Sequence, residues 1–295
     1  PKFNIKEPFK GLFTQGMVCH ETYKDQNNNW VNPEELVTIN GKKFLKNDKN
    51  NEVKVGPSES MSKSKKNTVD PEKIIQNYGA DSVRLFILSD SPPEKDVQWS
   101  DEGMLSSYKF LQKLWLMNQK ILKEIESNYQ PNDFKGLEIA SSEFVKNVEK
   151  NIENFSYNKI IANFHEMYSR VNKIINTKID KENLIKNYKN ILIAMMPVMP
   201  HFASECLENL KIESSKNNIE WPKINEDILI KNEVNFVIQI NGKKRHILEL
   251  KKNILESDLL EIVKKDKIME KYLNNKSIKK VIFIKNRLMN ILLNE

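Results

Sequence analysis

The chain carries at residues 59–67 the stretch Glu59-Ser60-Met61-Ser62-Lys63-Ser64-Lys65-Lys66-Asn67, in which small hydroxyl side chains alternate with lysines. Asp70-Pro71 follows and is typical of a helix N-cap with proline at the first helical position. Ammonium and hydroxyl groups beside a helix N-terminus suit phosphate. The pattern therefore predicts a mobile phosphate-binding loop. Short basic runs are also common as solvated linkers, and composition alone leaves both interpretations open.

The order of residues in this stretch carries a family resemblance. Met61-Ser62-Lys63-Ser64 resembles the signature loop Lys-Met-Ser-Lys-Ser of class I aminoacyl-tRNA synthetases. Ser60 stands where that signature has its first lysine, whereas Lys63 keeps the second, and we expect Lys65 to replace part of the missing charge. The flanking segments resemble leucyl-tRNA synthetases of the bacterial type, and these segments are Phe9–Val18, Val69–Pro71, Tyr78–Phe86 and Ser89–Pro93.

The resemblance implies ATP-dependent activation of leucine and its transfer to tRNA(Leu). It assigns Lys63 as the catalytic residue of the loop, because an ammonium group there would stabilise the charge that builds on the ATP phosphates during attack. Ser62, Ser64 and Met61 belong to the same ATP-binding loop by this resemblance. Mg²⁺ is expected to accompany ATP.

Two parts of the resembled family are missing from this sequence. The second signature, of the His-x-Gly-His type, does not occur, and neither does an editing domain. The chain also begins with Pro1 and not with methionine. We therefore expect a C-terminal portion of an enzyme that does not form leucyl-adenylate alone. The alternative hypothesis is a non-catalytic tRNA-binding remnant of a synthetase.

Length, net charge and cysteine content narrow the class of protein. A length of 295 residues predicts two or three domains, and the net charge of +7 favours an acidic partner. The sequence contains no run of about 18 apolar residues, so it predicts no membrane-spanning helix. Cys19 and Cys206 are far apart and lack a Cys-x-x-Cys partner, so neither a disulfide nor a protein-bound metal is predicted. We expect a cytoplasmic protein that is a monomer.

Residues 1–99 are expected to be the last part of an α/β nucleotide-binding, Rossmann-like catalytic domain, with the signature loop at 60–64. The apolar run Leu12–Cys19 predicts a strand buried on both faces, in which Gly16 allows close approach of a ligand or another backbone. A small β-rich insertion is predicted at about 21–57. Within it, Asn40-Gly41 signals a hairpin, and Asn47–Asn51 suggests a polar turn.

Residues 100–225 predict a helical bundle of the tRNA-binding, anticodon type, since amphipathic segments follow one another with short links. Ahead of it, short helices are predicted over 71–78 and 81–89. His201 follows Pro200 among apolar residues, so we interpret it as a packed or capping histidine and not as a catalytic base. The bundle helices are expected to start at Ser100 and to continue over 141–155, 157–176, 180–196 and 204–210.

Residues 226–295 predict a small α+β tRNA-binding domain. Strands are expected over 235–240, 244–250, 277–284 and 288–293, with Asn241-Gly242 as a hairpin turn and one helix over 257–273. This segment holds 13 Lys and 2 Arg against 7 Glu and 3 Asp, a net charge of +5. Lys243-Lys244-Arg245 and Lys279-Lys280 are the candidates for a phosphate-binding face.

Overall fold

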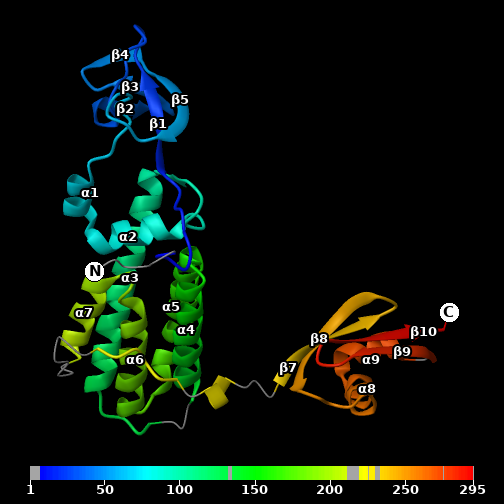
Figure 1. The fold of residues 1–295 in the computed structure, drawn as a ribbon. Helices are drawn as coiled ribbons and strands as arrows, with labels where there is room; N and C mark the ends of the chain where they lie inside the picture. Colours follow the sequence, from blue (N-terminus) through cyan, green and yellow to red (C-terminus); the bar gives the residue numbers. More distant parts are fainter. Residues whose placement is uncertain are drawn as a thin grey trace. The chain divides into compact units, whose positions relative to one another are not determined.

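The computed structural model describes residues 7–131, 135–210, 219–224, 226–229, 233–274 and 276–294. The chain divides into two compact units, Pro1–Ile224 and Asn225–Glu295 (Figure 1). The first unit contains two three-stranded sheets and a helical bundle, and the second contains a four-stranded sheet with two helices. The predicted helical and α+β parts are thereby confirmed.

A small sheet precedes the helices. β1 (Val18–Lys24) pairs antiparallel with β5 (Lys54–Ser60) and parallel with the two-residue strand β6 (Val97–Gln98). The prediction of a strand over Leu12–Cys19 was wrong, because β1 begins only at Val18 and Leu12 is 91% exposed.

The segment before β1 is held by the loop ahead of β6 and not by a sheet partner. Gly16 N donates to Pro93 O at 2.8 Å, and Met17 N donates to the Asp96 carboxylate at 2.8 Å. A Cβ atom on Gly16 would lie 2.1 Å from the carbonyl oxygen of Lys95. The predicted close approach of another backbone at Gly16 is therefore confirmed.

The insertion between β1 and β5 is a second sheet, in the order β2 (Leu36–Ile39), β3 (Lys42–Leu45) and β4 (Asp48–Glu52), after the short 3₁₀ helix η1 (Pro33–Glu35). Asn40-Gly41 forms the predicted hairpin turn, with φ angles of 48° and 80°. The predicted turn at Asn47–Asn51 was wrong beyond Asn47, because the rest of that segment belongs to strand β4, which pairs with β3 through Asp48 and Glu52. Strand pairing outweighs the turn preference of asparagine there.

Two short helices connect the sheets to the bundle. α1 (Pro71–Tyr78) begins after Asp70, whose carboxylate accepts the backbone N–H of Glu72, and ends at Gly79, whose φ is 80°. α2 (Ala80–Ser89) follows at once. Both predicted helices and the predicted caps are confirmed, since Asp70 satisfies a free N–H group and glycine adopts positive φ without strain.

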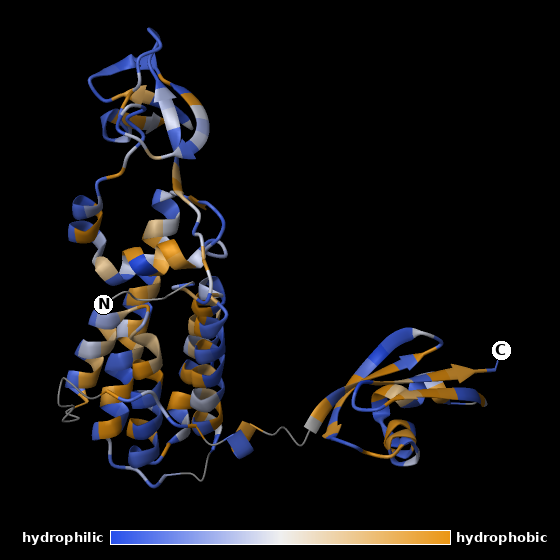
Figure 2. Cartoon of the chain, in the orientation of Figure 1, coloured by the Kyte–Doolittle hydropathy of each residue, from blue (hydrophilic) through white to orange (hydrophobic). Residues whose placement is uncertain are grey.

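The core of the bundle includes the fully buried Leu114, Phe164 and Ile191. Hydrophobic and hydrophilic residues alternate along the bundle helices (Figure 2). α4 and α5 lie side by side, and α6 contacts α4 (Figure 1). Two predicted starts were late, because α4 begins five residues before Ser141 and α7 begins at Pro200, which suits a first helical position. The helices are α3 (Asp101–Glu126), α4 (Gly136–Glu153), α5 (Tyr157–Ile174) with the 3₁₀ helix η2 (Ile175–Thr177), α6 (Lys181–Met195) and α7 (Pro200–Asn209).

Helix α2 fixes the break between α6 and α7. Arg84 donates from its guanidinium to the carbonyl oxygens of Val198 and Pro197, both at 2.7 Å. The carboxylate of Asp81, 4% exposed, accepts the backbone N–H of Phe202 at 2.6 Å. Asp81 thus caps α7 with an anion at the positive end of the helix. Helix α2, the second helix after the signature loop, is in this way anchored on the bundle.

Replacing Asp81 should loosen this anchor. We expect Asp81→Ala to lower the free energy of unfolding by about 1–2 kcal/mol, as for loss of a helix N-cap. Asp81→Asn keeps an oxygen that accepts the Phe202 N–H and should lose less. Denaturant unfolding followed by helical circular dichroism measures both variants, and an unchanged midpoint in Asp81→Ala would show that the cap contributes nothing.

The second unit has the strand order β8-β7-β10-β9. β7 (Glu233–Ile240) and β8 (Lys243–Lys251) form the hairpin predicted at Asn241-Gly242, β10 (Leu288–Leu293) runs parallel to β7, and β9 (Ile278–Ile284) runs antiparallel to β10. The 3₁₀ helix η3 (Glu226–Leu229) precedes them.

The single helix predicted over 257–273 is two helices, α8 (Glu256–Lys265) and α9 (Lys267–Leu273). Asp266 causes the break, because its carboxylate accepts the backbone N–H groups of Ile268 and Met269 and so starts a new helix. Leu259, Val263 and Met269 pack on one face of the sheet against the buried side chains of β7 and β10.

Candidate functional site

The signature loop lies between the end of β5 at Ser60 and the start of α1 at Pro71. It is closed around Asn67, whose side chain is fully buried. The Asn67 side-chain oxygen accepts the backbone N–H of Ser62 at 2.8 Å. Its amide group donates to the carbonyl oxygens of His20 and Glu59, at 3.2 and 3.1 Å. Asn67 therefore joins the loop to β1 and to β5.

Sequence reasoning missed the structural role of Asn67. In the sequence Asn67 is simply the last residue of the basic stretch 59–67. Its type carried no signal of burial, because asparagine is mostly exposed in folded proteins. A fully buried asparagine needs partners for both its oxygen and its amide, and the ends of two paired strands supply them here.

The loop hydroxyls are used partly within the loop. Ser62 Oγ accepts the backbone N–H of Lys65 at 3.3 Å and lies 3.3 Å from Ser64 Oγ. Lys66 adopts a φ of 55°, and its N–H donates to the Lys63 carbonyl at 3.2 Å. These contacts form a tight turn over residues 63–66, with Met61 half-buried at its start.

The lysines of the loop differ in their surroundings. Lys65 forms an ion pair with the carboxylate of Glu59, one residue before Ser60. Its charge is thus directed at Glu59, and this contact does not support the expectation that Lys65 replaces the lysine missing at Ser60. The side chain of Lys63 is exposed at the tip of the loop, and Ser60 is an exposed residue at the end of β5.

His201 was interpreted as packed or capping, and the structure corrects this. Its side chain is 76% exposed, and Nδ1 lies 3.0 Å from the carboxylate of Asp81. Asp81, and not His201, caps α7. The expectation failed because the apolar neighbours in sequence point to other sides of the helix.

The other histidines occupy structural positions. Burial lowers the pKa of His20 and of His165, and the ring of His165 stacks on Phe110 with centroids 3.8 Å apart. His246 Nε2 lies 3.6 Å from the Asp266 carboxylate. Within the part of the chain that the structure describes, no three His, Cys, Asp or Glu side chains gather as a group that could hold a metal ion.

The chain was compared with protein families, with curated proteins and with solved structures. Residues 50–100 match the family described as tRNA synthetases class I (I, L, M and V), and residues 139–263 match the anticodon-binding domain of tRNA ligase. The leucine–tRNA ligase of Rickettsia bellii (strain RML369-C) is 38% identical over 291 residues, which are 98% of this chain and 34% of the relative. Over 98% of its length the chain is thus similar to leucine–tRNA ligases.

Other leucine–tRNA ligases give the same match. The enzyme of Zymomonas mobilis subsp. mobilis is 36% identical over 98% of this chain and 33% of its own length. The chain thus spans about a third of the length of the curated relatives it matches. A crystal structure of the ternary complex of Agrobacterium radiobacter K84 agnB2 LeuRS-tRNA-LeuAMS has the same fold, with a TM-score of 0.64 and 22% identity over 80% of this chain and 31% of that one.

The basic residues of the second unit are divided over its sheet. Lys244 pairs with Gln239, and Lys280 pairs with Leu292, so both lysines lie on the sheet face opposite the helices, on the edge strands β8 and β9. Arg245 lies instead over the ring of Tyr272 in α9, at 4.6 Å from its centroid. The predicted run of three adjacent basic residues is therefore split between the two sides of the sheet.

No helix in the described part of the chain combines the length and the apolar character that a membrane crossing requires.

Proposed function

We propose that this chain is the C-terminal portion of a leucine–tRNA ligase, and that it supplies the loop for the ATP phosphates together with two tRNA-binding parts. The observation that carries the proposal is the loop Met61–Ser64, which presents the exposed ammonium group of Lys63 on a turn anchored by Asn67. The similarity to a leucine–tRNA ligase over 98% of the chain supports it.

The proposed reaction has two steps. In the first, the leucine carboxylate attacks the α-phosphate of ATP, pyrophosphate leaves and leucyl-adenylate forms. In the second, a hydroxyl of the terminal ribose of tRNA(Leu) attacks the carbonyl carbon of the adenylate, and AMP leaves. Lys63 stabilises the negative charge that builds on the phosphates in the first step, and the turn hydroxyls of Ser62 and Ser64 orient the loop. Mg²⁺ would enter as the companion of ATP. Leucine and ATP bind in the complete enzyme, and the chain alone makes no adenylate.

The architecture is part of the proposal. The parallel pair β1 and β6, with β5 beside it, is the remnant of a Rossmann-like nucleotide-binding sheet, and residues 1–99 are the last part of a catalytic domain. Residues 100–225 and 226–295 are the tRNA-binding bundle and the tRNA-binding α+β domain. A cytoplasmic location and a monomeric state remain predictions from the sequence.

Aminoacylation tests the function against its alternative. The protein encoded by the complete reading frame should charge tRNA(Leu) with radiolabelled leucine in the presence of ATP and Mg²⁺. A synthetase remnant would bind the tRNA without charging it. Isoleucine and methionine serve as control amino acids, and charging with either in place of leucine would contradict the assignment of the substrate.

RNA binding by the second unit has its own test. We expect the double variant Lys244→Ala/Lys280→Ala to weaken tRNA binding and to lower the slope of log K against log salt by about 2, since each phosphate contact contributes about one counterion. Lys264→Ala/Lys267→Ala removes the same charge from helices α8 and α9 and is the matched control. Titrations at several salt concentrations measure both slopes. Equal slopes in the two double variants would assign these lysines to solvated surface.

A further inference from the structure

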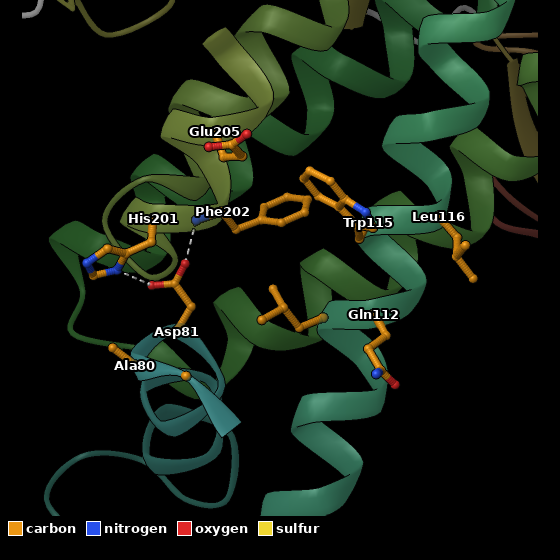
Figure 3. Close-up of a pocket in the computed structure, with 10 residues that line it drawn as sticks. Ala80, Asp81, Gln112, Trp115, Leu116, His201, Phe202 and Glu205 are labelled. Carbon is orange, nitrogen blue, oxygen red and sulfur yellow. Dashed lines mark hydrogen bonds and ion pairs between the residues drawn. The ribbon is translucent and has the colours of Figure 1, made fainter. Parts of the chain in front are cut away.

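A cavity lies away from the signature loop, between α2, α3 and α7 of the first unit (Figure 3). Its volume is about 650 Å³, within the range of sites that bind small organic molecules. Phe202 from α7 and Trp115 from α3 point toward one another across it (Figure 3). The described residues that line it are Gly79, Ala80, Asp81, Leu111, Gln112, Trp115, Leu116, His201, Phe202 and Glu205.

The walls of this cavity are mainly apolar. Trp115 is 37% exposed and Leu116 is 61% exposed, although both lie on a helix whose other face is buried in the core. Large apolar side chains that stay exposed beside a cavity mark a binding surface more often than scattered single residues do. A ligand that covers Trp115 and Leu116 would therefore bury apolar surface while removing few polar groups from water.

The charged groups at the cavity are acidic, in contrast to the rest of the chain. Glu205 and Asp81 are the carboxylates among the described lining residues, and neither lysine nor arginine is found among them. The chain as a whole has 47 Lys and Arg against 40 Asp and Glu. The oxygens of Asp81 already accept Phe202 N and contact His201 Nδ1, which leaves Glu205 as the carboxylate for a ligand. This chemistry disfavours RNA phosphates.

We propose that this cavity binds a small organic cation with an apolar or aromatic body, such as a hydrophobic primary amine. The body packs on Trp115, Leu111 and Phe202, and the ammonium group lies between Glu205 and the face of the Trp115 indole. An indole face attracts a cation through its quadrupole, and a nearby carboxylate adds Coulomb attraction. The site is separate from the loop proposed for ATP, so it does not depend on the proposed function.

Three probes with one body and different charges test the proposal on the 295-residue chain. These are 4-phenylbutylamine, 4-phenylbutanol and 4-phenylbutyrate, and calorimetry or saturation-transfer NMR measures their affinities. We expect the amine to bind at least about threefold more tightly than the alcohol, as for one partly exposed charge contact, and the acid to bind most weakly. An acid or alcohol that binds as tightly as the amine would overturn the proposal.

Variants locate the binding. Glu205→Gln should remove the preference of the chain for the amine over the alcohol, and Glu205→Lys should reverse it in favour of the acid. Glu208→Gln, on the same helix but outside the cavity, is the matched control and should keep the preference. Trp115→Ala should weaken all three probes, with circular dichroism confirming that the bundle is folded. Unchanged amine binding in Glu205→Gln and in Trp115→Ala would show that the probe binds elsewhere and would refute the assignment.

Discussion

Lys63→Ala in the complete enzyme should reduce ATP–pyrophosphate exchange by about 2–4 kcal/mol of transition-state stabilisation, as for loss of one preorganised electrostatic donor. The loop geometry gives the reason. Lys65 is engaged by Glu59, whereas the Lys63 side chain is exposed on the turn. Because the charge on the phosphates grows during attack, we expect the loss mainly in kcat and less in the KM for ATP.

Lys66→Ala is the matched control for this variant. Lys66 belongs to the same turn, is also exposed, and carries the same charge. If position decides the effect, Lys66→Ala should leave exchange within about threefold of the parent enzyme, the range of an exposed charge. Equal losses in both variants would mean that only the net charge of the loop matters, and an unaltered rate in Lys63→Ala would remove Lys63 from the mechanism.

Local signals in the sequence predicted the structure well where a residue acts on its own backbone. Asp70 and Gly79 set the ends of α1, and Asn40-Gly41 and Asn241-Gly242 set two hairpins. In each case the side chain, or its absence, satisfies or permits a conformation within a few residues. Such effects need no knowledge of the rest of the fold.

Predictions failed where the outcome depends on distant partners. The run Leu12–Cys19 is apolar enough for a buried strand, but Gly16 and Met17 bond to the loop at residues 93–96. In the sequence Asp266 resembles an ordinary polar residue of a helix, and only the break between α8 and α9 shows it as a cap. An apolar run predicts that a segment can be buried, but it does not predict which element the segment packs against.

The residues of the candidate site fall into the same two groups, those with a local signal in the sequence and those that act on distant partners. Lys63, Ser62 and Ser64 are predicted from their order in the chain, because a motif is a local pattern. The anchors Asn67 and Asp81 are not, because each acts on backbone groups that come from other elements. Their residue types are common, and only the three-dimensional arrangement distinguishes them from solvated neighbours.

Asn67 is the anchor with the larger expected effect. Asn67→Ala leaves the Ser62 N–H and the carbonyl oxygens of His20 and Glu59 without their partner, and each buried polar group left unpaired costs about 1–3 kcal/mol. The loop should relieve part of that cost by opening to water. We therefore expect a loss of about 2–4 kcal/mol in local stability, together with faster hydrogen exchange over residues 59–67.

The functional consequence follows from the position of Lys63 in this loop. Lys63 lies midway between Glu59 and Asn67, the two residues whose hydrogen bond closes the loop. A loop released from Asn67 no longer holds the ammonium group in place, and misplacement by about 1 Å can cost about 100-fold in rate. Pyrophosphate exchange in Asn67→Ala should therefore fall by about 10- to 100-fold, although no group that touches ATP in the proposal has been removed. Asn67→Asp keeps the oxygen for Ser62 but turns a second oxygen toward two carbonyls, so it should not restore the rate. Asn50→Ala, at an exposed asparagine of β4, is the control, and wild-type exchange kinetics with wild-type protection in Asn67→Ala would contradict the role of the anchor.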